Sequence, residues 1–149
     1  MSRSCDPQYP QTVSEILDDR IRFRRATIQA VLRLKESHPW KGTFAERKAK
    51  FHRLHKDLCR IYGKHTRLRF RKIDGGRSDD SSYNEVADVI TLRGKLSVIT
   101  YLHEFSHALG RNERGSCRWS VNLFKRCFPK QFSRCGYDGH LVRSQRRQT

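Results

Sequence analysis

The chain has 149 residues, of which 36% are hydrophobic and 32% are charged, and its formal net charge is +17. This length suits one domain with a single hydrophobic core. No run approaches about 18 consecutive apolar residues, which excludes a membrane-spanning helix, and we expect no membrane partner. The first residues lack the apolar run of a secretory signal, and the five cysteines lack disulfide-framework spacing. We therefore expect reduced thiols and a cytoplasmic location.

Two helices are predicted in the N-terminal half. The first spans residues 13 to about 35, because apolar residues recur there at helical spacing. The second runs through about Ile61. Thr43 and Glu46 form a capping box that opens it, and Gly63 ends it.

Strands and further helices are expected in the rest of the chain. Residues 65–73 are typical of a strand, and the Gly-, Ser- and Asp-rich residues 74–82 of a loop. A second strand is predicted over about 85–92. The last ordered helix is predicted over 113–127, and the fold class is therefore α+β.

The most informative motif is His-Glu-x-x-His within Tyr101–Gly110. Positions four apart lie on one face of a helix, so the imidazoles of His103 and His107 can both reach one metal ion. Glu104 would project beside that ion and act as the catalytic general base for a metal-bound water. This pattern predicts a Zn²⁺ site that hydrolyses peptide bonds.

The context of the motif supports this interpretation. Val98, Leu102, Phe105 and Leu109 form an apolar stripe, so that the two histidines project together from another face. The alternative is a pair of partly buried histidines satisfied by hydrogen bonds, beside a solvated glutamate.

A third ligand is expected from Glu113. Gly110 is a good C-terminal cap, and Asn112 is a good N-cap for the next helix. Glu113 is then the nearest oxygen donor able to turn back towards His107, and it would leave the fourth metal position to water. The alternative is a carboxylate that only complements the helix dipole.

The run 113–124 resembles the helix that follows the active site in ImmA/IrrE-type metallopeptidases, and Ile90-Thr91-Leu92 fits the strand before their motif helix. The resemblance covers about residues 86–129. It implies a zincin-like fold and Glu113 as third zinc ligand, although the interval from His107 is shorter than that family usually has. In zincin-like folds the strand before the motif helix is an edge strand, so the resemblance also implies that residues 85–92 can bind an extended substrate by main-chain hydrogen bonds. The spacing also resembles metzincins, but these require a methionine turn and the only methionine is Met1.

A second resemblance is to SprT-like proteases, some of which act on DNA-bound proteins. These take their third ligand further along the chain, which makes His140 the rival to Glu113, with Tyr137 a candidate for stabilising an oxyanion. The downstream cysteines have no Cys-x-x-Cys spacing, which argues against a zinc ribbon.

The charge is unevenly distributed. Residues 1–73 carry a net +12 and residues 111–149 a net +8, whereas residues 74–110, which include the motif, carry −3. Basic flanks favour a polyanionic partner such as nucleic acid. Alternation in the predicted strand places three candidate phosphate-binding side chains on one face: Arg67, Arg69 and Arg71. The alternative is a solvated face that protects a sheet edge from aggregation.

The sequence therefore predicts a disordered tail at 1–12, one minimal zincin-like domain at 13–140 and a basic flexible tail at 141–149. The predicted function is zinc-dependent hydrolysis of an intracellular protein or peptide substrate. The alternatives are an SprT-like protease acting on DNA-bound proteins, and a nucleic-acid-binding regulator with a structural zinc.

Overall fold

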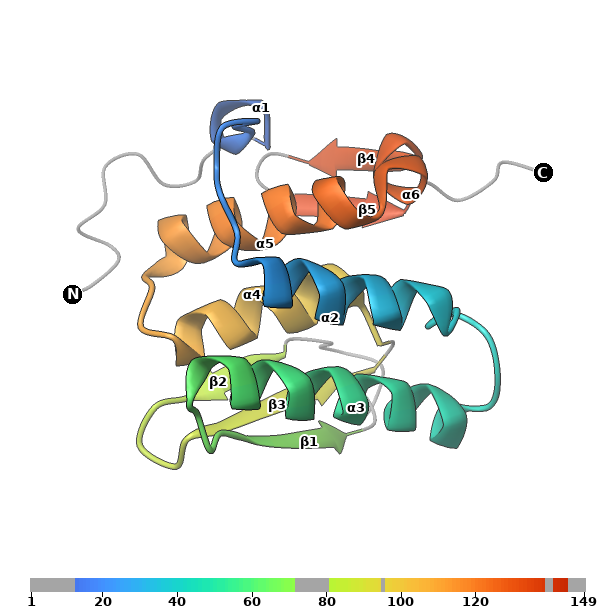
Figure 1. Cartoon of the computed structure of the whole chain (residues 1–149), viewed down its shortest axis with the longest axis vertical. Helices are drawn as coiled ribbons and strands as arrows, with labels where there is room; N and C mark the ends of the chain where they lie inside the picture. The colour runs from blue at the N-terminus through green and yellow to red at the C-terminus, as the bar shows by residue number, and fades with distance from the viewer. Residues whose placement is uncertain (1–12, 72–80, 95, 139–140, 145–149) are drawn as a thin grey trace.

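The computed structural model describes residues 13–71, 81–94, 96–138 and 141–144, without the side chains of 136–144. Within them the fold is α+β (Figure 1), with six helices, a three-stranded sheet and a two-stranded hairpin. The elements are α1 Val13–Ile16, α2 Arg25–Glu36, α3 Phe44–Tyr62, β1 Arg67–Arg71, β2 Ser82–Asn84, β3 Val89–Arg93, α4 Val98–Ala108, α5 Glu113–Cys127, α6 Pro129–Ser133, β4 Cys135–Asp138 and β5 Leu141–Ser144. None of the described helices combines the length and apolar character needed to span a membrane.

The three-stranded sheet has the order β1-β3-β2, with β1 parallel and β2 antiparallel to β3. The predicted strand at 85–92 was therefore wrong in two respects: it begins at Val89, and it is central rather than at an edge. The edge strand beside α4 is β2. Its first residue, Ser82, falls in the predicted loop, and Tyr83 and Asn84 were assigned to no element. Three residues are too few to show a strand periodicity.

The first predicted helix is also corrected, because it is two helices, α1 and α2, joined by a non-helical segment. Asn122 of α5 explains the break. Its amide donates to the Ile16 carbonyl and accepts from the Asp18 N–H. The Asp18 carboxylate then accepts from the Arg20 N–H and closes a tight turn. The main-chain groups of Ile16 and Asp18 thus hydrogen-bond to Asn122 instead of continuing a helix.

The second predicted helix is confirmed as α3. The Thr43–Glu46 capping box is present, and Gly63 ends the helix with a φ of 65°.

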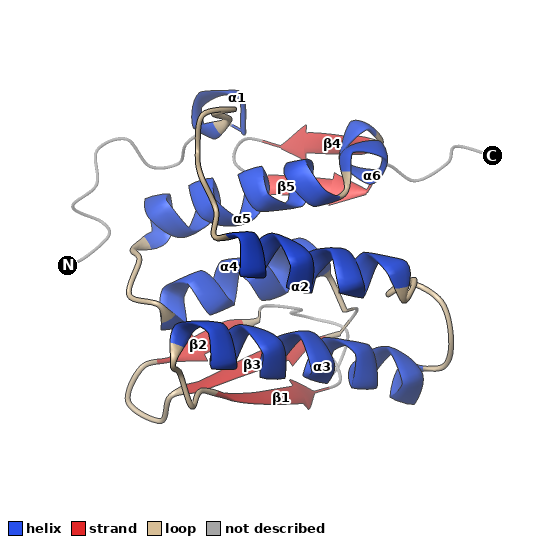
Figure 2. Ribbon diagram, in the orientation of Figure 1, coloured by secondary structure: helices blue, strands red, loops and turns tan. Residues whose placement is uncertain are grey.

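Helix α4 lies within the fold, contacting β2 and β3 as well as α5. Figure 2 shows the three strands gathered at the bottom of the view and α5 above α4. Phe105 is fully buried and contacts the rings of Tyr101 and Trp119. Because this side chain anchors one face of α4 in the core, His103 and His107 project from another.

A buried polar network ties α3 to α4. His55 Nε2 lies 2.7 Å from the Thr66 carbonyl oxygen, and Nδ1 lies 2.7 Å from the Tyr101 hydroxyl. The carbonyl can only accept, so Nε2 carries the proton and Nδ1 accepts from Tyr101. Burial lowers the pKa of His55, and its hydrogen bond to Thr66 only partly opposes this.

This network predicts acid sensitivity of the fold. The unfolded chain takes up a proton on His55 near pH 6.5, whereas the folded chain does so only at lower pH. The free energy of unfolding should therefore fall as the pH drops below about 6.5. Denaturant unfolding at several pH values, in the presence of a chelator, measures this free energy. Its decrease at low pH should be smaller in the His55→Gln variant than in the unchanged protein. An equal loss in both proteins would mean that other groups cause the acid sensitivity.

The C-terminal part contains elements that the sequence did not predict. Phe128 ends α5, as expected, but the five-residue α6 follows it with Pro129 in the first turn, where a missing N–H costs nothing. Strands β4 and β5 then pair antiparallel. The predicted tail at 141–149 is thus corrected at its start, because 141–144 form β5. The predicted tail at 1–12 lies outside the described residues.

Candidate metal centre

The connection between α4 and α5 brings the predicted ligands together. Gly110 has a φ of 100°, and its N–H donates to the His107 carbonyl, so the chain leaves α4 through a conformation that favours glycine. Asn112 caps α5 by accepting from the Gly115 N–H at 2.8 Å. Both predicted caps are confirmed, and the two caps place Glu113 in the first turn of α5.

Three side-chain atoms converge at the centre. His103 Nε2 and His107 Nε2 are 3.2 Å apart, and Glu113 Oε1 lies 3.1 Å and 3.0 Å from them respectively. The side chains of His103, His107 and Glu113 retain 17%, 24% and 33% of their exposure, so the cluster is open to solvent on one side.

This spacing fits a shared metal ion. Bonds of about 2.0–2.1 Å place neighbouring donors between about 2.8 Å apart in octahedral geometry and about 3.4 Å apart in tetrahedral geometry. The three separations fall inside that interval. Two imidazoles and one carboxylate suit Zn²⁺, and they also suit non-haem Fe²⁺.

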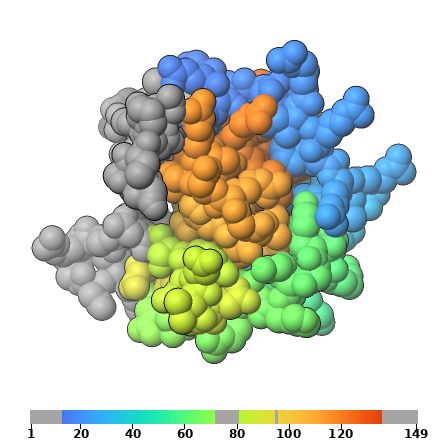
Figure 3. Space-filling view, turned by 90° about the vertical axis from the view of Figure 1, so that its left-hand side faces the viewer, coloured from blue at the N-terminus to red at the C-terminus, as the bar shows by residue number. Residues whose placement is uncertain are grey.

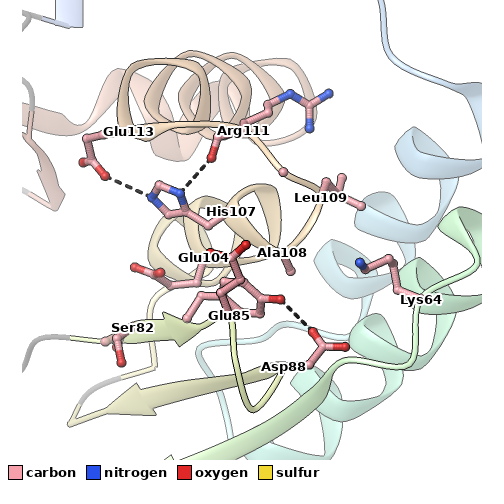
Figure 4. Close-up of a pocket in the computed structure, with 13 residues that line it drawn as sticks. Lys64, Ser82, Glu85, Asp88, Glu104, His107, Ala108, Leu109, Arg111 and Glu113 are labelled. Atoms are coloured by element: carbon pink, nitrogen blue, oxygen red, sulfur yellow. Dashed lines mark hydrogen bonds and ion pairs between the residues drawn. The ribbon is translucent and has the colours of Figure 1, made fainter. Parts of the chain in front are cut away.

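A main-chain hydrogen bond on the side away from the cluster orients the His107 ring. Its Nδ1 lies 3.0 Å from the Arg111 carbonyl oxygen, which can only accept, so Nδ1 carries the proton (Figure 4). The lone pair of Nε2 is then directed at the cluster. Metal-binding histidines usually have such a partner on the second nitrogen.

The charges of the cluster are strongly coupled. Hydrogen bonds from His103 and then His107 hold the pKa of Glu113 far below its usual range. Burial alone would lower the pKa of His107, but its hydrogen bonds to Glu113 and Arg111 raise it overall. Protons and a metal cation therefore compete for the same lone pairs in weakly acidic solution.

Glu104 lies beside the cluster and is 9% exposed. The alternative of a solvated glutamate is therefore wrong. Burial raises the pKa of Glu104, the charges of His103 and His107 lower it, and the backbone N–H of Tyr83 in β2 donates to its carboxylate. A carboxylate with a raised pKa is a better proton acceptor, which suits a general base.

These groups open onto a groove of about 790 Å³. Its lining includes Glu104, His107 and Glu113 on one side and Ser82 and Tyr83 of β2 on the other. Figure 3 views this side of the molecule, where the orange α4–α5 connection lies next to the yellow-green segment that contains β2. The groove thus runs past the cluster of candidate metal ligands and along an edge strand.

Asp88 lines the groove and positions the Tyr83 side chain of β2. Its Oδ1 accepts from the Tyr83 hydroxyl at 2.8 Å and from the Thr66 hydroxyl at 2.7 Å. Its φ of 54° lies in the left-handed region, which tightens the turn before β3. Neither Asp88 nor Tyr83 belongs to a recognisable motif, since only the fold brings them to the groove.

Cys117 is a further residue that the sequence reasoning did not assign to the site. Its thiol donates to Glu113 Oε2 at 3.7 Å, and burial raises its pKa to about 12. Sγ also lies close enough to form an alternative metal set with His103 and Glu113. Cys117 and Glu113 are four apart on α5, which could have suggested their contact. We favour His107 over Cys117 as a ligand, because its nitrogen faces the same Glu113 oxygen as His103.

The other predicted residues lie elsewhere. Arg67, Arg69 and Arg71 are exposed on β1 and do not line the groove. His140, the rival third ligand, and the side chain of Tyr137 lie outside the described part of the structure.

Comparison with known proteins gives no match to a family model, to a curated protein or to a solved structure. The functional argument therefore rests on the geometry of the site.

Proposed function

We propose that the chain is a zinc-dependent peptidase with a minimal zincin-like core, acting on an extended segment of a protein or peptide. In this proposal His103, His107 and Glu113 hold the metal, and Glu104 is the general base. The observation that carries it is the convergence of two imidazole nitrogens and one carboxylate oxygen within 3.0–3.2 Å, with a second, buried carboxylate, that of Glu104, alongside.

Each group of the chain has a chemical role in this proposal. A zinc ion bound there would polarise a peptide carbonyl and bring the pKa of a bound water to about 7. Glu104 would accept the proton of the attacking water and deliver it to the leaving amine. The Tyr83 N–H holds the Glu104 carboxylate in place. Glu104 is the reason to favour zinc over Fe²⁺, because hydrolysis needs a proton acceptor at this position.

The groove supports an extended substrate. Strand β2 is an edge strand of the described sheet, and its residues Ser82 and Tyr83 line the groove. A substrate chain can add main-chain hydrogen bonds to such an edge, which selects for an extended backbone rather than for a particular side chain.

The test uses the full chain loaded with zinc and a library of denatured-protein peptides, with new termini identified by mass spectrometry. We expect cleavage that stops when a chelator removes the metal and returns when zinc is restored. A metal-loaded protein that cleaves nothing in the library, or cleavage that persists without metal, would contradict the proposal.

A further inference from the structure

Strand pairing places four arginines on the face of the sheet opposite the helices. In a paired sheet, partner residues share a face, and alternate residues along a strand do so too. The pairings form three rows across the sheet, namely Arg67–Val89–Asn84, Arg69–Thr91–Ser82 and Arg71–Arg93. No acidic side chain occurs in these rows of the described sheet.

The two faces of the sheet differ in the side chains that β1 contributes to them. Leu68, Phe70, Ile90 and Leu92 belong to the opposite face, and all four are part of the hydrophobic core or pack against it. On the arginine face, Arg67, Arg69 and Arg71 are exposed and Arg93 is half-buried, whereas Val89 and Thr91 of the central strand are buried. The sheet therefore presents a cationic surface outward while it covers the core on its inner side.

We propose that this arginine face binds the phosphate backbone of double-stranded nucleic acid without reading its sequence. Alternate residues of a strand stand about 6.6 Å apart, so the guanidinium groups of β1 form a regular row able to contact separate phosphates. Arginine suits this partner because its planar fork can donate two hydrogen bonds to one phosphate.

Protection of a sheet edge does not account for the whole pattern. Edge protection would place charges on β1, which is an edge strand of the described sheet. Arg93, however, lies on the central strand, beside Arg71. The four arginines thus extend across two strands, as a binding surface requires.

A single strand is a poorer match than a duplex. Proteins that bind single strands without sequence preference stack the bases on aromatic side chains. The three rows of this face contain no aromatic residue, whereas the aromatic residues of these strands, Phe70 and Tyr83, belong to the other face. Contacts are therefore restricted to the backbone, which a duplex presents on its outside.

The arginine face is separate from the metal centre. None of the four arginines lines the groove, and binding there requires neither a metal nor Glu104. The inference thus goes beyond the proposed peptidase function and does not rest on it.

The test compares two triple variants of the full chain with the same loss of three charges. The first carries R67Q, R69Q and R71Q; the control carries R126Q, K130Q and R134Q, which remove three exposed cations on α5, α6 and the turn after it. Binding to fluorescein-labelled DNA and RNA duplexes is measured by anisotropy over a range of salt concentrations. Circular dichroism and thermal unfolding establish that each variant is folded.

We expect the first variant to bind either duplex much more weakly, and its salt dependence to lose about 0.9 in log–log slope per phosphate contact removed. The single variant R69Q should lose about one such contact, which keeps the test valid if the triple variant does not fold. Equal weakening in the control would assign the binding to net charge alone. That result, the absence of duplex binding at low salt, or tighter binding of a single strand of equal length would each overturn the proposal.

Discussion

Glu104→Gln is expected to lower the rate of peptide hydrolysis by about 10²–10⁴-fold while the zinc content stays unchanged. The amide has nearly the same shape as the carboxylate but cannot accept the proton of an attacking water. Burial raises the pKa of Glu104, which makes its carboxylate a better proton acceptor. The Glu104→Gln variant lacks this proton acceptor. Steady-state cleavage of a peptide found in the library screen, measured beside metal analysis, gives both quantities.

A matched control is available on the same groove. Glu85 also lines it but is exposed and lies in the turn after β2. Glu85→Gln changes the same chemical group and should alter the rate by less than about tenfold, since no proton transfer is assigned to it. Unchanged hydrolysis in Glu104→Gln would remove Glu104 from the mechanism even if the zinc site is real.

The second large effect concerns the ligand set. His107→Ala and Glu113→Ala should each abolish stable zinc binding, because each variant lacks one of the three proposed metal ligands. Cys117→Ser should retain zinc, with affinity reduced by at most about 10–100-fold, since its thiol only contacts the outer oxygen of Glu113. His140→Ala should also retain it. Metal content after dialysis against a competing chelator measures all four variants.

Two results would revise this assignment in different ways. Full occupancy in His107→Ala together with loss in Cys117→Ser would move the metal to the set of His103, Glu113 and Cys117. A sulfur-containing set would then favour a structural zinc. Loss in His140→Ala with full occupancy in Glu113→Ala would instead make His140 the third ligand. Iron in place of zinc in the purified protein would contradict the assignment of the metal.

Local signals explain what the sequence could predict. The capping box at Thr43, the glycine at 110 and the N-cap at Asn112 act within one helical turn, and each lies where it was expected. Together the last two determine how α4 passes to α5. The convergence of His103 and His107 with Glu113 could therefore be anticipated from a short stretch of chain.

Long-range contacts explain what the sequence could not predict. The break after α1 depends on Asn122, more than 100 positions away, and helical periodicity carries no sign of that contact. Strand β2 is too short to show alternation, yet it carries the Tyr83 N–H that meets Glu104. The burial of Glu104 likewise becomes evident only when β2 packs beside α4.

The partner of His107 on its second nitrogen is a main-chain carbonyl, at Arg111. Every amino acid has that oxygen, so replacement of the Arg111 side chain leaves the hydrogen bond to the imidazole available. The vulnerable position is instead Gly110. A Cβ there would meet no atom within 4 Å, but the φ of 100° would be strained for any other residue. Mutational tolerance at this turn is thus opposite to what side-chain contacts alone suggest: the side chain of Arg111 can vary without loss of the hydrogen bond to His107, whereas Gly110 cannot be replaced without strain although a side chain there would have space.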